Sequence, residues 1–152
     1  NIPGPGYSAG PCLVKDTMQL AAFARNQFSL GHAAMMVNEG LVIHVVDDLR
    51  LRYDLSAMTV GLLGMAFKAE IDDTRASLSY KFKKMLVPLA KAVLTTDPFV
   101  GSDPALIPLE EVVAKSDLLI LCTPHARYKE ADLKGKPVVD VWSFLPNANV
   151  VY

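Results

Sequence analysis

The spacing of apolar residues changes near residue 58, and this change divides the chain into two regions. Before it, apolar residues recur at intervals of three and four; after it, short apolar runs alternate with amphipathic segments. The first pattern is typical of α-helices, and the second is typical of strands that alternate with helices. The sequence therefore predicts a helical region over 1–57 and an α/β domain over 58–152.

Two helices are expected in the first region. The shorter covers residues 16–27, where Asp16 fits an N-cap and Gln19 fits its capping-box partner. The longer begins at Ser29, also a suitable N-cap, and runs to about Arg52 with apolar residues on more than one side. Such a helix would pack on its own domain and also on a second subunit or a further domain. An ordinary core helix is the alternative.

The second region is predicted to form a parallel sheet with helices on both faces, because its strands and helices alternate. Near-continuous apolar runs agree with strands that are buried on both faces. The expected elements are strands at 59–63, 92–96, 118–122, 138–141 and 150–152, and helices at 77–86, 108–115 and 125–132. The predicted fold class is α/β: a Rossmann-like parallel sheet preceded by a helical segment.

Composition narrows the class of function. Hydrophobic residues make up 51% of the chain, which is enough for a sizeable core and excludes bulk disorder. The net charge of −1 gives no basic field, so nucleic acid is not an expected partner. No charge-free apolar run reaches about 18 residues, so no membrane span is expected. Two cysteines without an even framework favour a reducing compartment, which predicts a cytoplasmic protein.

The candidate chemistry gathers in the N-terminal segment Gly4-Pro-Gly-Tyr-Ser-Ala-Gly-Pro-Cys-Leu-Val-Lys-Asp16. Its glycines allow the backbone to approach a ligand, and successive N–H groups in such a loop can form an anion site. Cys12 stands where the loop meets a helix start, and the oriented amides and Lys15 favour a thiolate there. Taken singly, a glycine-rich loop is more often a turn and a lone cysteine more often inert, and Asp16 equally fits a helix cap.

A further group of candidates follows the first expected strand. In parallel sheets, ligands bind beyond the carboxyl ends of the strands. Lys68 would supply a positive charge there for phosphate or sugar oxygens, and Arg75 has a geometry suited to bidentate phosphate contact. The alternative for both side chains is ion pairing with nearby carboxylates, namely Glu70, Asp72 and Asp73.

The remaining polar candidates are predicted to lie outside the functional site. Asp97 follows the second expected strand at the usual ribose-binding place, but Asp97-Pro98 is equally a turn former and stays outside the predicted site. His125, after the third expected strand, is predicted to cap the helix that follows. No metal site is predicted, because His32 and His44 lack partners at ligand spacing.

Two motifs, in order, resemble the nucleotide-sugar 6-dehydrogenases, the UDP-glucose and GDP-mannose dehydrogenase family. The N-terminal motif is a glycine loop followed by Cys12 and, three and four residues later, by Lys15 and Asp16. The other motif resembles the family's strand, Ala-Phe-Lys turn and Asp-x-Arg-x-Ser segment; it reads Gly61-Leu-Leu-Gly-Met-Ala-Phe-Lys-Ala-Glu-Ile-Asp-Asp-Thr-Arg-Ala-Ser77. The resemblance covers nearly all of this chain but only the C-terminal part of a family enzyme.

The resemblance implies oxidation of the sugar C6 alcohol to a carboxylate with two NAD. Cys12 would attack the aldehyde to give a thiohemiacetal and then a thioester, and Asp16 would position or deprotonate the water that hydrolyses it. Lys15 completes the implied catalytic set. The implied substrate-binding residues, all from the two motifs, are Tyr7, Gly10, Phe67, Lys68 and Arg75.

The same resemblance implies the partners. The substrate would be a UDP-sugar or a GDP-sugar, and the long helix would form the core of a homodimer. NAD would be bound mainly by a domain absent from this chain, so the chain alone is expected to be inactive. Region 1–57 would then be the active-site loop and dimerisation segment, and region 58–152 the domain that binds the nucleotide-sugar.

Two departures from the family pattern qualify the substrate. Ser8-Ala9 stands where Gly-Gly is usual, and residues 140–143 lack an arginine that many relatives carry, which weakens UDP-glucose as the specific substrate. One alternative is a non-catalytic module for nucleotide-sugar binding and dimerisation, in which Cys12 is incidental. Another is a thiol-dependent acyl or redox enzyme, which would need a histidine or second cysteine beside Cys12.

Overall fold

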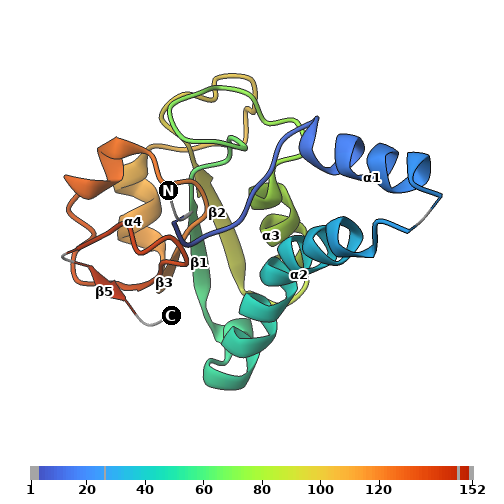
Figure 1. The fold of residues 1–152 in the computed structure, drawn as a ribbon. Helices are drawn as coiled ribbons and strands as arrows, with labels where there is room; N and C mark the ends of the chain where they lie inside the picture. The colour runs from blue at the N-terminus through green and yellow to red at the C-terminus, as the bar shows by residue number, and fades with distance from the viewer. Residues whose placement is uncertain (1–3, 26, 147, 151–152) are drawn as a thin grey trace.

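The computed structural model describes residues 4–25, 27–146 and 148–150. Helices and strands alternate after residue 58, as predicted (Figure 1). In chain order the elements are α1 (Leu13–Phe23), α2 (Ser29–Arg52), η1 (Leu55–Ala57), β1 (Thr59–Leu63), α3 (Leu78–Leu86), β2 (Ala92–Thr96), α4 (Leu109–Lys115), β3 (Leu118–Leu121), η2 (Ala126–Lys129), β4 (Pro137–Val139) and β5 (Asn149–Val150).

The strands form one sheet in the order β2-β1-β3-β4-β5, and every neighbouring pair is parallel. The predicted parallel sheet is therefore confirmed. From β1 the chain goes to β2 on one side and then returns to β3 on the other. The carboxyl ends of β1 and β3 consequently border the switch point, which is where sheets of this type bind ligands.

Both faces of the sheet are covered by helices, as the apolar strands predict. Successive residues of a strand point to opposite faces. Val60 and Leu62 of β1 belong to one buried cluster with Phe82 of α3. Leu63 of the same strand belongs to a second cluster with Val112 of α4. Figure 1 shows the corresponding layers, with α2 and α3 on one side of the sheet and α4 on the other.

The long helix α2 has the predicted bounds but two different halves. Its second half is buried, because Val42, Val45 and Leu49 pack into the α3-side cluster. Its first half leaves apolar side chains in solvent: Leu30 is 77% exposed and Val37 is 75% exposed. The sequence pattern of a helix that is apolar on several sides thus corresponds to one face in the core and one face that no other described residue covers.

Helix α1 packs on α2 and projects away from the sheet (Figure 1). Ala21 is its one buried residue, whereas Phe23 is 87% exposed. No helix among the described residues is long and apolar enough to cross a membrane.

Two predicted helix caps are wrong. Helix α1 begins at Leu13, and the backbone N–H of Asp16 donates to the carbonyl of Cys12 at 2.8 Å, so Asp16 lies inside the first turn. The apolar residues before Asp16 extend the amphipathic pattern back to the loop, which moves the N-cap to Cys12. Likewise Ser29 is the first residue of α2, and Phe28 is its N-cap without a side-chain cap bond.

The other boundaries differ by a few residues. The expected strand at 118–122 ends one residue earlier, and the expected helix at 125–132 is a short 3₁₀ turn, η2. The strand expected at 150–152 lies partly outside the described residues; its described part pairs with β4 as β5. The boundary between regions 1–57 and 58–152 stays a prediction.

Candidate functional site

The N-terminal loop lies against the loop that joins β1 to α3, so the two sequence motifs meet. Gly10 has a φ of +120°, and a Cβ added to it would lie 2.9 Å from Cε2 of Phe67. Its N–H also donates to the carbonyl of Ala76 at 3.4 Å. Only glycine combines this backbone conformation with so close an approach to the ring. Two predicted site residues, Gly10 and Phe67, are therefore in contact.

Helix α2 holds the same loop from the other side. The Asn38 side chain accepts a hydrogen bond from the Ser8 N–H and donates one to the Ser8 carbonyl, each at 2.7 Å. Because both backbone groups of Ser8 are satisfied, the middle of the loop is fixed to the helix. Sequence reasoning missed Asn38, whose one signal is an amide that follows the apolar run 33–37 of α2.

Tyr7 anchors the loop in the core. It is 8% exposed, its hydroxyl donates to the carbonyl of Cys122, and its ring centroid lies 4.7 Å from that of Trp142. Burial raises the pKa of the Tyr7 hydroxyl well above its usual range, followed by a smaller effect of Cys122 in the same direction. The structure thus gives Tyr7 an anchoring role, and its contact with a nucleotide-sugar stays a prediction.

Cys12 is exposed at the N-cap of α1, one turn before Lys15 and Asp16. Lys15 pairs with Asp16 at 2.7 Å, and both side chains are exposed. The hydrogen bond to Asp16 and the charge of that carboxylate raise the pKa of Lys15, and Cys12 adds a smaller effect of the same sign. Arg75, from the other motif, also interacts electrostatically with Cys12. The three predicted catalytic residues therefore share one exposed place at the start of α1.

The predicted phosphate contacts have different surroundings. Arg75 forms a bidentate pair with Asp73, in which Nη2 lies 2.7 Å from Oδ2 and Nε lies 3.1 Å from Oδ1. This hydrogen bonding raises the pKa of Arg75 and lowers that of Asp73. The ion pair considered as an alternative for Arg75 is thus present. Lys68 is exposed, and no ion pair joins it to another described residue.

Asp97 binds the start of the β1–α3 loop. Its Oδ2 accepts hydrogen bonds from the N–H groups of Met65 at 2.6 Å and Ala66 at 2.9 Å, and it faces Nε2 of His125 at 3.1 Å. Burial alone would raise the pKa of Asp97, but these hydrogen bonds outweigh it and lower the pKa far below its usual range. The carboxylate is wholly buried, so it is not available to a ribose at the usual place.

His125 is the N-cap residue of η2, as predicted, but its side chain does not do the capping. Its side chain makes no cap bond there, because the ring turns inward and is wholly buried. Nδ1 accepts from the Glu70 N–H at 3.0 Å, and Nε2 faces Asp97. The sequence did contain a signal for this cluster: Asp97 and His125 each stand just after a strand whose carboxyl end borders β1.

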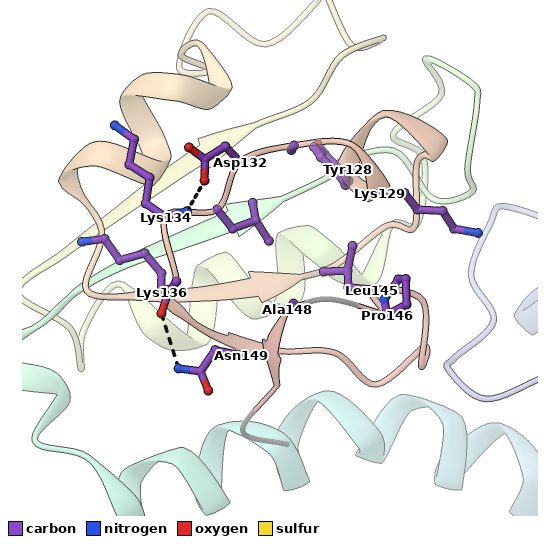
Figure 2. A pocket seen from close by; sticks show the side chains of 12 residues that line it. Tyr128, Lys129, Asp132, Lys134, Lys136, Leu145, Pro146, Ala148 and Asn149 are labelled. Carbon is purple, nitrogen blue, oxygen red and sulfur yellow. Dashed lines mark hydrogen bonds between the residues drawn. The ribbon is translucent and has the colours of Figure 1, made fainter.

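A separate hollow of about 170 Å³ lies near β4 and β5, at the far edge of the sheet. In Figure 2, Lys134 and Lys136 extend to one side of it while Leu145 and Pro146 lie on the other. Its lining contains none of the predicted site residues. This hollow is therefore not part of the candidate site.

The sheet does not fit NAD in the manner of dinucleotide-binding folds. The turn after β1 lacks the G-x-G-x-x-G fingerprint, and Gly64 is its one glycine with positive φ. Asp97, the acid at the ribose-binding place, is wholly buried and already accepts hydrogen bonds from Met65 and Ala66. The described part of this sheet therefore offers neither the glycine-rich turn nor the available acid with which dinucleotide-binding folds hold NAD.

Comparison of the sequence with known proteins identifies relatives of this chain. Residues 61–147 match the sequence profile of the UDP-glucose/GDP-mannose dehydrogenase family, UDP binding domain. A UDP-N-acetyl-D-mannosamine dehydrogenase of Pyrococcus horikoshii is 32% identical over 140 residues, which cover 87% of this chain and 32% of the relative. A UDP-glucose 6-dehydrogenase of Bacillus subtilis is 31% identical over 143 residues, covering 86% of this chain and 31% of the relative.

Solved structures show the same fold. The UDP-D-ManNAc dehydrogenase of Pyrococcus horikoshii superposes with a TM-score of 0.83 at 27% identity, over 100% of this chain and 38% of that one. The GDP-mannose dehydrogenase of Pseudomonas aeruginosa gives 0.80 at 26% identity, over 98% and 39%. This chain spans about a third of the length of the curated relatives it matches. With more than half of its residues matched to the family profile, the chain belongs to the UDP-glucose/GDP-mannose dehydrogenase family.

Proposed function

We propose that this chain is the part of an NAD-dependent nucleotide-sugar 6-dehydrogenase that binds the nucleotide-sugar and carries the thiol that captures the C6 aldehyde. The observation that carries the proposal is the contact of Gly10 with Phe67, because it joins the cysteine loop to the carboxyl edge of the sheet. Region 1–57 supplies the thiol and the dimer contact, and region 58–152 binds the nucleotide. NAD is held mainly outside this chain.

Capture of the aldehyde is the chemical step that belongs to this chain. The Cys12 thiolate attacks the aldehyde carbon, a C–S bond forms, and the carbonyl oxygen takes up a proton, which gives a thiohemiacetal. Lys15 follows Cys12 by three residues at the start of α1, which places a cation on the same turn as the sulfur. The exposed carboxylate of Asp16 positions or deprotonates the water that releases the oxidised product as a carboxylate.

The nucleotide-sugar is bound by the β1–α3 loop. Lys68 and Arg75 contact the diphosphate, and the Phe67 ring forms the wall between the diphosphate and the cysteine loop. Lys68 is suited to this role because its ammonium is exposed and has no ion-pair partner among the described residues. Arg75 would exchange part of its bidentate contact with Asp73 for phosphate oxygens.

Calorimetric titration tests the binding proposal. UDP-glucose, UDP-N-acetylhexosamines and GDP-mannose are titrated separately into the 152-residue chain, and at least one of them is expected to bind selectively. Lys68→Met should weaken that ligand by about tenfold or more, the loss of one charge-assisted contact. Lys134→Met, at the far edge of the sheet, is the matched control and should bind as wild type. Heat from none of the nucleotides would contradict the proposal.

The exposed face of α2 is proposed to pair with a second copy of the chain. A hollow of about 660 Å³ lies on this face, and its apolar lining includes Leu30, Val37 and Leu41. Leaving such a face in water is unfavourable, and a second apolar helix would cover it. Val37→Glu is therefore expected to give a monomer by light scattering, whereas Lys84→Glu on α3 should keep the dimer. A monomeric wild-type chain would contradict the pairing.

A further inference from the structure

Two buried polar groups hold the β1–α3 loop on either side of its proposed ligand contacts. Asp97 binds the N–H groups of Met65 and Ala66, and His125 binds the N–H of Glu70. Only residues 67–69 lie between these anchors. The proposed contacts Phe67 and Lys68 are thus set in a three-residue span whose ends are fixed from inside the sheet.

The hydrogen bonds define the state of the His125 ring. Nδ1 accepts a hydrogen bond from the Glu70 N–H, so it carries no proton. Nε2 therefore carries the ring proton and donates a hydrogen bond to Asp97. The ring is wholly buried between Phe99, at 5.0 Å between centroids, and Tyr128, at 5.7 Å. His125 is consequently held in one tautomer and one orientation, with an acceptor facing the loop.

The loop adopts a backbone conformation at Glu70 that needs such support. Glu70 has a φ of +62°, which residues other than glycine rarely adopt, and such conformations persist where the surroundings impose them. Here the imposing contacts come from the segment after β3: the ring of His125 accepts from the Glu70 N–H, and the Ala126 N–H donates to the Glu70 carboxylate at 2.7 Å.

We propose that His125 is a positioning residue that, through the Glu70 N–H, sets Phe67 and Lys68 for nucleotide-sugar binding. It touches no substrate itself; it acts by fixing the second end of the three-residue span, while Asp97 fixes the first. The proposal rests on the proposed function for what the span binds, but the positioning itself is a property of the free chain.

Two substitutions of His125, each of which keeps one hydrogen-bonding group of the ring and loses the other, test the proposal. His125→Asn keeps an acceptor near the Nδ1 position and loses the donor to Asp97, whereas His125→Gln keeps a donor near Nε2 and loses the acceptor for Glu70. Affinity for the nucleotide-sugar that binds wild type in the titrations is measured by calorimetry, and the thermal midpoint is measured alongside. The Gln variant is expected to bind about three- to tenfold more weakly than the Asn variant at a similar midpoint. His32→Gln, on the exposed side of α2, is the control and should match wild type.

Amide hydrogen exchange at Glu70 separates failure of this proposal from failure of the proposed function. Exchange should be faster in His125→Gln than in His125→Asn and wild type, whether or not a nucleotide binds. If wild type binds none of the titrated nucleotide-sugars, the function proposal fails and the exchange result alone decides the positioning. Equal Glu70 exchange in both variants, or affinity losses that merely follow the midpoints, would overturn it.

Discussion

Cys12→Ala, made in the full-length dehydrogenase that we propose contains this chain, is expected to lower kcat on the order of 10⁴-fold while nucleotide-sugar affinity is kept. Removing the sulfur abolishes the covalent capture that divides the oxidation into easier steps. Affinity should persist, because Cys12 is exposed at the start of α1 and the proposed contacts to the nucleotide come from the β1–α3 loop. Turnover is measured as NADH absorbance, and affinity is measured by calorimetry.

Cys122→Ala is the matched control for loss of a thiol. Cys122 is wholly buried beyond β3, and burial raises the pKa of its thiol, so it offers no nucleophile. Its replacement should lower the thermal midpoint slightly and leave kcat close to wild type. If Cys12→Ala turned over as fast as wild type, the thiol would be incidental and the chain would be a module for nucleotide-sugar binding and dimerisation.

Asp97→Ala is expected to destabilise the chain by about 3–5 kcal/mol, because it leaves several buried donors unpaired. The carboxylate accepts from Met65 and Ala66 just after β1, and its Oδ1 accepts from Phe99 at 2.8 Å and Val100 at 3.0 Å. Urea unfolding gives the free energy of unfolding directly.

Asp132→Ala is the control for this prediction. The Asp132 carboxylate accepts from the Lys134 N–H within its own turn, so its loss should change the free energy of unfolding by less than about 1 kcal/mol.

The same carboxylate makes a defined contribution to stability against acid. The pKa of Asp97 is lower in the folded chain than in the unfolded chain, so its contribution is fully present above the unfolded value and is lost as pH falls below about 4. The difference in unfolding free energy between wild type and Asp97→Asn should therefore shrink in acid. A difference that stayed constant from neutral pH to about pH 3 would contradict this role.

The strands and the long helix were predictable because their signals are local. The strands 59–63 and 92–96 and the helix 29–52 were predicted at their observed bounds, since apolar runs and periodicity decide them. Helix starts were less predictable, because a cap depends on neighbours as much as on its own residue. Asp16 has the right side chain for a cap, but the helix already includes the apolar residues before it.

The two motifs of the candidate site could be found in the sequence, whereas the residues that support them could not. Gly10 and Phe67 were predicted separately, and only the fold shows that a side chain at Gly10 would collide with the Phe67 ring. Asn38 and His125 carry no motif; their partners lie 30 and 55 residues away in the sequence, at Ser8 and Glu70. Hydrogen bonds over such separations depend on the sheet order, which composition and spacing do not determine.

The central claim is that the Cys12 sulfur lies beside the bound nucleotide-sugar. Alkylation by iodoacetamide, followed by mass spectrometry of the 152-residue chain, tests it most directly. Cys12 is exposed and should react, while the buried Cys122 serves as the internal unreactive reference. Saturating UDP-glucose, or whichever nucleotide-sugar binds in the titrations, is expected to slow labelling of Cys12 severalfold. Labelling of Cys12 at an unchanged rate, with the nucleotide-sugar shown to be bound, would contradict the claim.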